Sequence, residues 1–427
     1  MASGPQTTIA LLAQKLQRRW VPKWYEAFTH DADGGFHERL GHSFKPVKTG
    51  QRRLLTQCRQ LAVYAHAVAE GNAHFKPNLA QHLDFIVTYY KGGCDGSWVF
   101  AVDDDLVTQH EMYDLYAHAF VIFALAHYER AVKDGQGKTL AMQVLAFINQ
   151  AFRVDGQEGL TEALNDRYDP INLPRRHESH MHLFEACLFA YEVFEEDGFL
   201  EMSEYMVDLF RNYFYKKDQS FLSEYFDQEL NPVEQNGNIV KEPGHYCEWI
   251  WLLKKFAALK GESDCYDDIC LTLLDWANAY GWDTRYGGIY DELGADNQII
   301  TDTKRLWPFS EALKANALML DSGVDKDGIK DYIAHMVSVF NEHYMDERGF
   351  WTEWLSRDLQ PQTDYMPGTT PYHVYFGITE AQEALQLRGE TKSMRLGVLS
   401  GVYDVRRSLS ETVRRFRKLL TKNTNGF

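Results

Sequence analysis

A histidine and a glutamate at the start of one helical segment have the types and spacing for acid–base chemistry. In residues 242–251 (EPGHYCEWIW) a Pro-Gly pair precedes an aromatic, apolar run, which predicts that a buried helix begins here. His245 then lies at the helix start, with Glu248 three residues on, on the same face. Such a pair can share a proton and hold one imidazole tautomer, as proton transfer requires. The same spacing also suits a histidine bonded to backbone, with Glu248 in solvent.

Polar side chains interrupt three other apolar helical patterns near their starts. Arg59 interrupts the run at 54–64, His182 comes just before an apolar helix, and His373 follows a helix entrance set by proline. Helix starts can meet at one end of a ring of helices. Three histidines at equivalent positions in separate segments therefore favour a shared site over three unrelated structural roles.

A metal centre is not expected from the sequence. His177 and Glu178 with His180 resemble a zinc-protease signature, but the second histidine comes one position too early for HExxH. No convincing third ligand follows. The six cysteines are scattered without a CxxC pair, which disfavours both a zinc site and a disulfide framework.

Composition and charge narrow the class of protein. A chain of 427 residues with 45% hydrophobic and 14% aromatic content can bury a large core. The formal charge of -17 argues against nucleic acid and against an anionic membrane surface as partners. The N-terminus lacks a cationic segment followed by a long apolar run, and no apolar stretch reaches about 18 residues. These features predict a soluble, cytoplasmic protein.

A short motif recurs along the chain at nearly equal intervals. It consists of an Asp near Gly, followed by alternating apolar and polar residues that end near an acid, as in residues 31–38 and 217–224. Turn residues followed by period-two alternation predict a tight turn that leads into a short strand. The six copies, 60 to 65 residues apart, start at Asp31, Asp95, Asp155, Asp218, Asp283 and Asp346.

Two helical patterns lie between successive turns, which predicts six helical hairpins. Several patterns are apolar nearly all round, as at 119–126, and should form an inner layer that is covered on both sides. Six hairpins close into an all-α (α/α)6 barrel with short β-hairpins at its mouth, and we expect a single domain over 1–427. The predicted helices are 9–28, 53–70, 76–90, 111–132, 140–152, 182–195, 201–213, 246–260, 266–280, 304–320, 328–343 and 372–387.

The C-terminal segment 388–427 differs from the acidic body. It carries ten Lys and Arg residues against three acids, and residues 405–420 have helical spacing. A basic helical extension of this kind could be a solvated terminal helix, or it could dock on the acidic body or on another subunit. The sequence leaves open whether the protein is a monomer or a homodimer.

Four ordered motifs resemble the N-acylglucosamine 2-epimerase superfamily, over about residues 20–387. They are HMHLFEA at 180–186, GHYCEW at 244–249, RLWPFSEA at 305–312 and PYH at 371–373. The resemblance implies an (α/α)6 barrel, chemistry at its mouth that needs no metal or other cofactor, and a sugar substrate. By motif position it also implies site residues: a catalytic pair His245 and His373, a supporting Arg59, a third His182, the paired acid Glu248, and substrate-lining Tyr116 and Trp307.

Sugar isomerisation explains why such residues are needed. The C2 proton of an open-chain sugar is weakly acidic, so a base must remove it while the carbonyl is stabilised as an enediolate. Arg59, with His182 as a second donor, can stabilise that oxyanion. We hypothesise that His373 removes the C2 proton and that His245, oriented by Glu248, opens the pyranose ring and then acts as the partner acid or base.

The expected reaction is the interconversion of D-mannose and D-fructose, with D-lyxose and D-xylulose as a candidate second pair. Residues 364–372 lack the pattern of the disaccharide epimerases and resemble the monosaccharide isomerases, and no arginine cluster suits a phosphate. Glu178 replaces the family's Asn and stays a candidate substrate-binding residue. Two alternatives are a 2-epimerase of mannose and glucose on the same scaffold and a glycoside hydrolase that uses two carboxylates.

Overall fold

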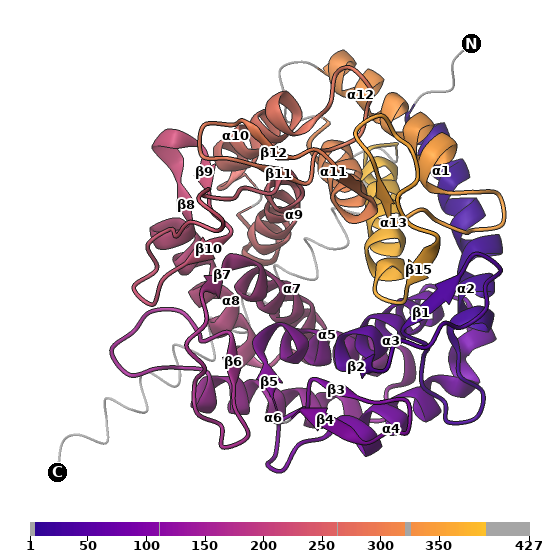
Figure 1. Cartoon of the computed structure of the whole chain (residues 1–427), viewed down its shortest axis with the longest axis vertical. Coiled ribbons are helices and arrows are strands. Elements are labelled where there is room, and N and C mark those ends of the chain that lie inside the picture. The colour runs from indigo at the N-terminus through magenta and orange to yellow at the C-terminus, as the bar shows by residue number, and fades with distance from the viewer. Residues whose placement is uncertain (1–4, 111, 263, 321–325, 390–427) are drawn as a thin grey trace.

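Six inner helices form a closed ring in the computed structural model, which describes residues 5–110, 112–262, 264–320 and 326–389. Each inner helix packs against the next, and the last packs against the first (Figure 1). The inner helices are α3 (Leu54–Ala69), α5 (Leu115–Val132), α7 (His177–Phe194), α9 (Pro243–Lys260), α11 (Leu306–Met319) and α13 (Thr370–Gly389).

An outer layer of helices surrounds this ring (Figure 1). The first outer element is nearly continuous, because the π-helical turn η1 (Leu16–Trp20) joins α1 to α2. Similar π-helical turns, η3 (Phe210–Phe214), η5 (Ala277–Gly281) and η6 (Phe340–Tyr344), end three other outer helices, and two 3₁₀ turns are η2 (Ala73–Asn78) and η4 (Lys217–Gln219). The outer helices are α1 (Pro5–Lys15), α2 (Val21–Phe28), α4 (Leu79–Tyr90), α6 (Gln136–Ala151), α8 (Asp197–Leu209), α10 (Asp267–Trp276) and α12 (Lys326–Val339).

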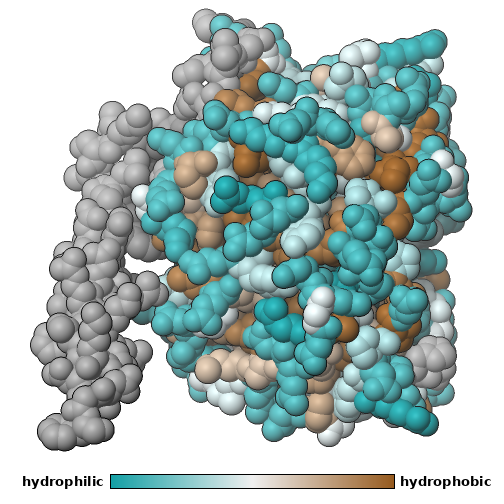
Figure 2. Space-filling model, turned by 90° about the vertical axis from the view of Figure 1, so that its left-hand side faces the viewer, coloured by the Kyte–Doolittle hydropathy of each residue, from teal (hydrophilic) through white to brown (hydrophobic). Residues whose placement is uncertain are grey.

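The two layers follow from hydrophobic patterning. Nearly every residue of α5 is buried, as its apolar sequence predicts, whereas α6 buries only one face against it. Figure 2 shows one side of the molecule, where hydrophilic residues predominate and hydrophobic ones are scattered. The predicted (α/α)6 barrel is therefore confirmed. No helix in the described part of the chain is long and apolar enough to cross a bilayer.

Short strands surround one end of the ring, where the inner helices begin. Five inner helices are preceded by a strand that pairs with a strand from another repeat, in the pairs β2–β3, β5–β6, β7–β10, β13–β14 and β15–β1. The α9 entrance has the equivalent bridge between Lys241 and Leu293. In the last pair Arg39 lies opposite Pro367, so the final repeat is joined to the first and the ring closes.

The remaining strand pairs are hairpins on the same scaffold, β3–β4, β8–β9 and β11–β12. The strands are β1 (Arg39–Gly41), β2 (Arg52–Arg53), β3 (Ala101–Val102), β4 (Thr108–His110), β5 (Tyr113–Asp114), β6 (Ala163–Leu164), β7 (Arg175–Arg176), β8 (Tyr215–Lys216), β9 (Phe221–Leu222), β10 (Tyr225–Phe226), β11 (Glu292–Leu293), β12 (Ile299–Thr301), β13 (Lys304–Arg305), β14 (Trp354–Leu355) and β15 (Tyr365–Pro367).

Several predicted helix starts near the site are wrong, and those of α7 and α11 have a common cause, a two-residue strand directly before each helix. Helix α7 begins at His177 rather than at 182, because the polar residues 177–180 form its first turn directly after strand β7. Helix α11 begins at Leu306 rather than at 304, because Lys304 and Arg305 pair with strand β14. Local hydrophobic patterning could not detect either strand, since each is two residues long. The predicted basic helix at 405–420 lies outside the described residues.

Candidate active site

The histidines and the arginine predicted for the site all lie in the first two turns of inner helices. His245 is the third residue of α9, His373 the fourth of α13, and His182 and Arg59 are each the sixth residue of their helices, α7 and α3. Because these helices start at the same end of the ring, the side chains come together there. The indole of Trp307, at the start of α11, has its centroid 4.7 Å from the His245 ring and 5.5 Å from the His373 ring.

His245 is held by a carboxylate that the sequence analysis did not identify. Its Nδ1 lies 2.8 Å from Oε2 of Glu224, which comes from the loop between β9 and β10. Both carboxylate oxygens of Glu248 lack a hydrogen-bond partner in the described part of the chain. The prediction that Glu248 orients His245 is therefore wrong. Glu248 lies one helical turn deeper and faces the side chains below the site.

A change in the repeat explains why Glu224 is free to bind His245. In four repeats the acid that ends the turn motif accepts the backbone N–H of the residue before an inner helix, and in three of them that residue is an arginine that also bonds the acid. These pairs are Glu38 with Arg53, Glu162 with Arg176, and Asp291 with Arg305. In the α9 repeat the arginine is replaced by Glu242, whose N–H bonds Oε1 of Glu224 at 3.0 Å. Oε2 of Glu224 is then left for histidines.

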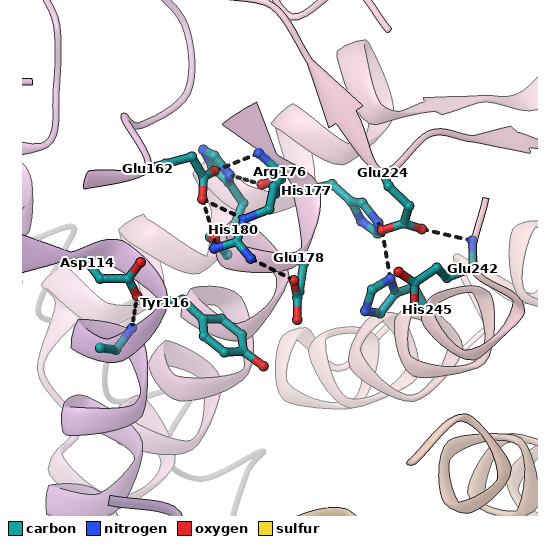
Figure 3. A network of polar contacts seen from close by, with 12 residues as sticks. Asp114, Tyr116, Glu162, Arg176, His177, Glu178, His180, Glu224, Glu242 and His245 are labelled. Carbon is teal, nitrogen blue, oxygen red and sulfur yellow. Dashed lines mark hydrogen bonds and ion pairs between the residues drawn. The ribbon is translucent and has the colours of Figure 1, made fainter. Parts of the chain in front are cut away.

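The second histidine bound to Glu224 is His177. Its Nε2 lies 2.8 Å from Oε2 of Glu224, and its Nδ1 lies 3.1 Å from Nε1 of Trp249 (Figure 3 shows the carboxylate between His177 and His245). An indole nitrogen can only donate, so Nδ1 of His177 must be an acceptor. Nε2 of His177 therefore carries the hydrogen and donates it to Glu224.

This environment keeps His245 protonated. Burial alone would lower the pKa of His245, but the charge of Glu224 and its hydrogen bond outweigh burial and raise the pKa to about 10. Glu242 and Glu178 add to the rise. Because Nδ1–H is directed at Glu224, Nε2–H of the imidazolium is the proton that His245 can give to a bound molecule. At neutral pH His245 is thus equipped to act as an acid.

His373, in contrast, is a neutral imidazole. Burial lowers the pKa of His373 to about 3, against the opposing hydrogen bond from its Nδ1 to Oε1 of Glu311, at 3.0 Å. Lys314 lies 2.6 Å from the other oxygen of Glu311, and Lys314 and His373 together outweigh burial and lower the pKa of that carboxyl to about 2. Ionised Glu311 must accept, so Nδ1 of His373 carries the hydrogen. Its Nε2 lone pair is then free to take a proton.

Arg59 lies among aromatic rings between the histidines. Its guanidinium lies 4.2 Å from the ring centroid of Phe120 and 4.7 Å from that of Tyr372, and one NH2 group donates to the Tyr116 hydroxyl at 2.5 Å. Its Nε is buried without a partner, and no carboxylate of the described residues forms an ion pair with it. A cation whose charge is not neutralised by an acid is suited to stabilising an oxyanion.

A group of buried acids lies below the histidines. His182 Nδ1 is 3.1 Å from Oε2 of Glu185 and 3.7 Å from Oε1 of Glu248, and Tyr372 donates to the same oxygen of Glu185 at 2.5 Å. Glu185, Glu248 and Glu311 all lie close enough to interact with the buried ammonium of Lys314, which forms an ion pair with Glu311. Burial, joined by the charges of its neighbours, raises the pKa of Glu248 far above its ordinary value, and burial raises that of Glu185 to about 7. Protonation therefore removes part of the negative charge.

Two further carboxylates face the site from its rim. Glu178 bonds Arg176 at 3.2 Å, and the charges of Arg176, His245 and His182 together outweigh burial and lower the pKa of Glu178 to about 2. Glu242 bonds Arg305 at 2.7 Å, but burial prevails and raises its pKa to about 7. Figure 3 shows Glu178, His245 and the Tyr116 ring pointing toward one another. The predicted residues Glu178 and Tyr116 therefore lie in the site.

Hydrogen-bond donors argue against a metal among these residues. Three groups of histidines and acids in the described residues have potential ligand atoms within 4.8 Å of one another, and one is His177, Glu224 and His245. Trp249 forces Nδ1 of His177 to accept, so Nε2 carries a hydrogen and has no lone pair for a metal. In the other two groups Tyr372 donates to Glu185, and the ammonium of Lys314 forms an ion pair with Glu311. The expectation of no metal is consistent with this donor pattern.

Comparisons with known proteins agree with these observations. A model of the N-acylglucosamine 2-epimerase (GlcNAc 2-epimerase) family matches residues 34–377. The chain is 26% identical to a mannose-6-phosphate isomerase from Rhizobium meliloti, over 88% of this chain and 97% of that protein. It is 22% identical to a D-mannose isomerase from Marinomonas mediterranea, over 84% and 93%. The structure of a cellobiose 2-epimerase from Spirochaeta thermophila superposes with a TM-score of 0.81 at 19% identity, over 90% and 98% of the two chains, which confirms the fold.

Proposed function

Because the chain belongs to the N-acylglucosamine 2-epimerase family, we propose that it is an aldose–ketose isomerase that interconverts D-mannose and D-fructose without a metal ion. The observation that carries this proposal is a protonated imidazole and a neutral one against the same indole: His245 beside Glu224 and His373 beside Glu311, both next to Trp307. Proton transfer between neighbouring sugar carbons needs such an acid and base.

The first step in this proposal is ring opening. His245 donates its Nε2 proton to the ring oxygen as the C1–O5 bond breaks, and it recovers a proton from the O1 hydroxyl. His245 ends the step as it began, and the sugar becomes an open-chain aldose. Trp307 stacks on the apolar face of the sugar and holds C1 and C2 between the two imidazoles.

The second step is proton transfer between C2 and C1. Nε2 of His373 takes the C2 proton, the carbonyl oxygen becomes an enediolate oxygen next to Arg59, and His245 protonates that oxygen. The resulting enediol loses its O2 proton to His245 as His373 returns a proton to C1, which gives the ketose. For His182 to assist as a donor from Nε2, its Nδ1 must accept from protonated Glu185, a state that the raised pKa of Glu185 favours.

The rim favours an uncharged monosaccharide over a phosphorylated one. Three arginines at the rim, Arg53, Arg176 and Arg305, are each bound to buried carboxylates, and Arg59 is proposed to bind the enediolate. Glu178 adds an ionised carboxylate that would repel a phosphate. This differs from what the name of the Rhizobium meliloti relative suggests for that protein. Comparing the rates with mannose and with mannose 6-phosphate therefore tests the proposed substrate directly.

The test of the proposal is to incubate the protein with D-mannose and to identify the products by NMR. We expect D-fructose as the main product, the same rate after dialysis against a chelator, and a kcat/KM for mannose 6-phosphate at least about tenfold lower than for mannose. Glucose as the main product would establish a 2-epimerase, the alternative that the cellobiose 2-epimerase relatives support. Activity that is lost on chelation and restored by a divalent ion would contradict the proposed chemistry.

The glycoside hydrolase alternative has less support. The paired carboxylates that it requires are present in the described residues only as ion-paired or deeply buried groups, such as Glu178 with Arg176 and Glu311 with Lys314. The family match also favours an isomerase or epimerase. A hydrolase would release reducing sugar from mannosides and would leave free mannose unchanged, so the same NMR experiment separates the two.

A further inference from the structure

A fully buried histidine outside the proposed sugar-binding set is linked to His245 through one carboxylate oxygen. His177, the first residue of α7, has a relative exposure of 0%, and its ring meets the His245 ring edge-on at a centroid distance of 5.1 Å. Both of its ring nitrogens are in use, one toward Trp249 and one toward Glu224. His177 therefore does not need to touch a sugar to affect the reaction.

The direction of each hydrogen bond from Trp249 through His177 to Glu224 is fixed by the chemistry of the groups. Trp249 is fully buried, and its ring packs 4.2 Å from Phe210, so its indole N–H has one direction. That N–H makes Nδ1 of His177 an acceptor, so Nε2–H donates to Oε2 of Glu224. The same oxygen accepts Nδ1–H of His245, and Oε1 accepts the backbone N–H of Glu242. All of the donors that fix the Glu224 carboxylate are thus buried.

We propose that His177 is a positioning residue that, through Glu224, holds the His245 ring in place and limits how tightly His245 keeps its proton. The donor from His177 stabilises the charge on Glu224 and so weakens the hold of that carboxylate on the His245 proton. Without it, Oε2 of Glu224 would serve His245 alone, His245 would become a weaker acid, and the carboxylate could rotate. The proposal rests on the isomerase function given above, in which His245 must give and recover protons.

Besides Glu224, other charged groups lie around His245, and in the described residues none of them forms a hydrogen bond or ion pair with the side chain of His177. Glu178 and Glu242 act on His245 and are themselves paired with Arg176 of β7 and Arg305 of β13. Deeper in the ring, His182 and Glu248 lie one turn below. Because the ion pairs of these groups do not involve the His177 side chain, a change in the titration of His245 after a substitution at 177 would come through Glu224. Glu242, the residue before α9, is held by Arg305 and meets Glu224 only through its backbone.

Two substitutions of similar size separate the bond to Glu224 from simple packing. In His177→Gln the amide nitrogen can take the place of Nε2 and keep donating to Glu224. In His177→Asn the side chain reaches only as far as Nδ1, so it can still accept from Trp249 but loses the bond to Glu224. Both leave a neutral amide in the same buried position, and thermal unfolding by circular dichroism establishes that each variant is folded.

The readout is the titration of the His245 imidazole, followed by ¹⁵N NMR in the substrate-free protein. We expect His177→Asn to raise the midpoint of the His245 titration by about 0.5 to 1 pH unit and His177→Gln to leave it close to wild type. We also expect kcat to fall by about tenfold in His177→Asn with KM changed less than about twofold, and kcat to recover in His177→Gln. A structural role alone would not move the titration.

An unchanged His245 titration in folded His177→Asn would overturn the proposal, as would equal effects of the Asn and Gln variants. If neither variant folds, the ring ¹⁵N shifts of His177 in the wild-type protein decide. A protonated Nε2 with an accepting Nδ1 supports the link through Glu224 to His245, and the opposite tautomer overturns it. The NMR result does not depend on turnover, so a protein that shows the shift but makes no fructose would overturn the proposed function alone.

Discussion

Replacing His373 with asparagine is expected to lower kcat for mannose isomerisation by on the order of 10³-fold, because it removes the base for the C2 proton. Burial keeps the imidazole neutral, and ionised Glu311 fixes the hydrogen on Nδ1, so Nε2 is the only nitrogen that can take a proton. An asparagine can still bond Glu311 but has no group that accepts a proton at neutral pH. Fructose formation from mannose, measured at saturation, gives the loss in kcat, and KM should change little.

A matched control for His373 is His66, which lies near the C-terminal end of inner helix α3, away from the candidate site. His66 is also buried, and its Nδ1 bonds the Tyr375 hydroxyl at 2.9 Å. His66→Asn should lower the temperature of unfolding without a loss in kcat, because it removes a buried imidazole that is remote from the sugar. A folded His373→Asn protein that keeps more than about a tenth of the wild-type kcat would contradict the assignment of His373 as the base.

Replacing His245 with asparagine is expected to lower kcat by about 10² to 10³-fold, because ring opening and proton exchange at O1 and O2 lose their acid.

The companion change Glu224→Gln tests whether Glu224 is what keeps His245 protonated. With Glu224 the pKa of His245 is about 10, so activity that needs protonated His245 persists at neutral pH and is lost as the pH rises through about 10. Without that charge the pKa falls, and the alkaline limb of kcat should move down by about 1 to 3 pH units.

The measurement is the pH–rate profile of Glu224→Gln from neutral pH to pH 11. Gln still accepts from His177 or His245 through its amide oxygen, so the ring position is largely kept while the charge is removed. Glu248→Gln is the matched comparison, since the sequence first suggested Glu248 for this role, and it should leave the alkaline limb of the profile close to that of wild type. An alkaline limb that moves with Glu248 and not with Glu224 would contradict the observed pairing.

The fold and the meeting of the histidines could be predicted because both depend on regular spacing. Six turn motifs at 60 to 65 residues implied six hairpins, and polar residues at helix starts implied a common end of the ring. His245 and His373 do meet there, against Trp307. Each of these inferences needed only the position of a residue within its own repeat.

The partners of the histidines could not be predicted in the same way. Local spacing favoured Glu248, three residues from His245, whereas the observed partner Glu224 is 21 residues away and is brought in by the β9–β10 loop. A signal was nevertheless present: Glu224 ends the fourth turn motif, and Glu242 stands where three other repeats have an arginine bound to that acid. Comparing repeats, rather than scanning one helix, would have singled out Glu224.

The acids below the site were also missed. Glu311 and Lys314 lie three residues apart in apolar helix α11, and Glu185 lies in apolar helix α7. Spacing shows that such residues are unusual in a buried helix but not that they face one another across the ring. Only the packing of α7, α9, α11 and α13 brings them together under His182 and His373.

Conversion of unlabelled D-mannose in D2O, followed by ¹H and ¹³C NMR at C1 and C2, tests the central claim that histidines move a proton between these carbons. Because the proton resides on a histidine that can exchange with solvent, we predict fructose that carries solvent deuterium at C1 in a measurable fraction of molecules, formed equally fast in the presence of a chelator. Fructose that retains all of its hydrogen from C2, made only when a divalent ion is present, would show hydride transfer at a metal and would contradict the account.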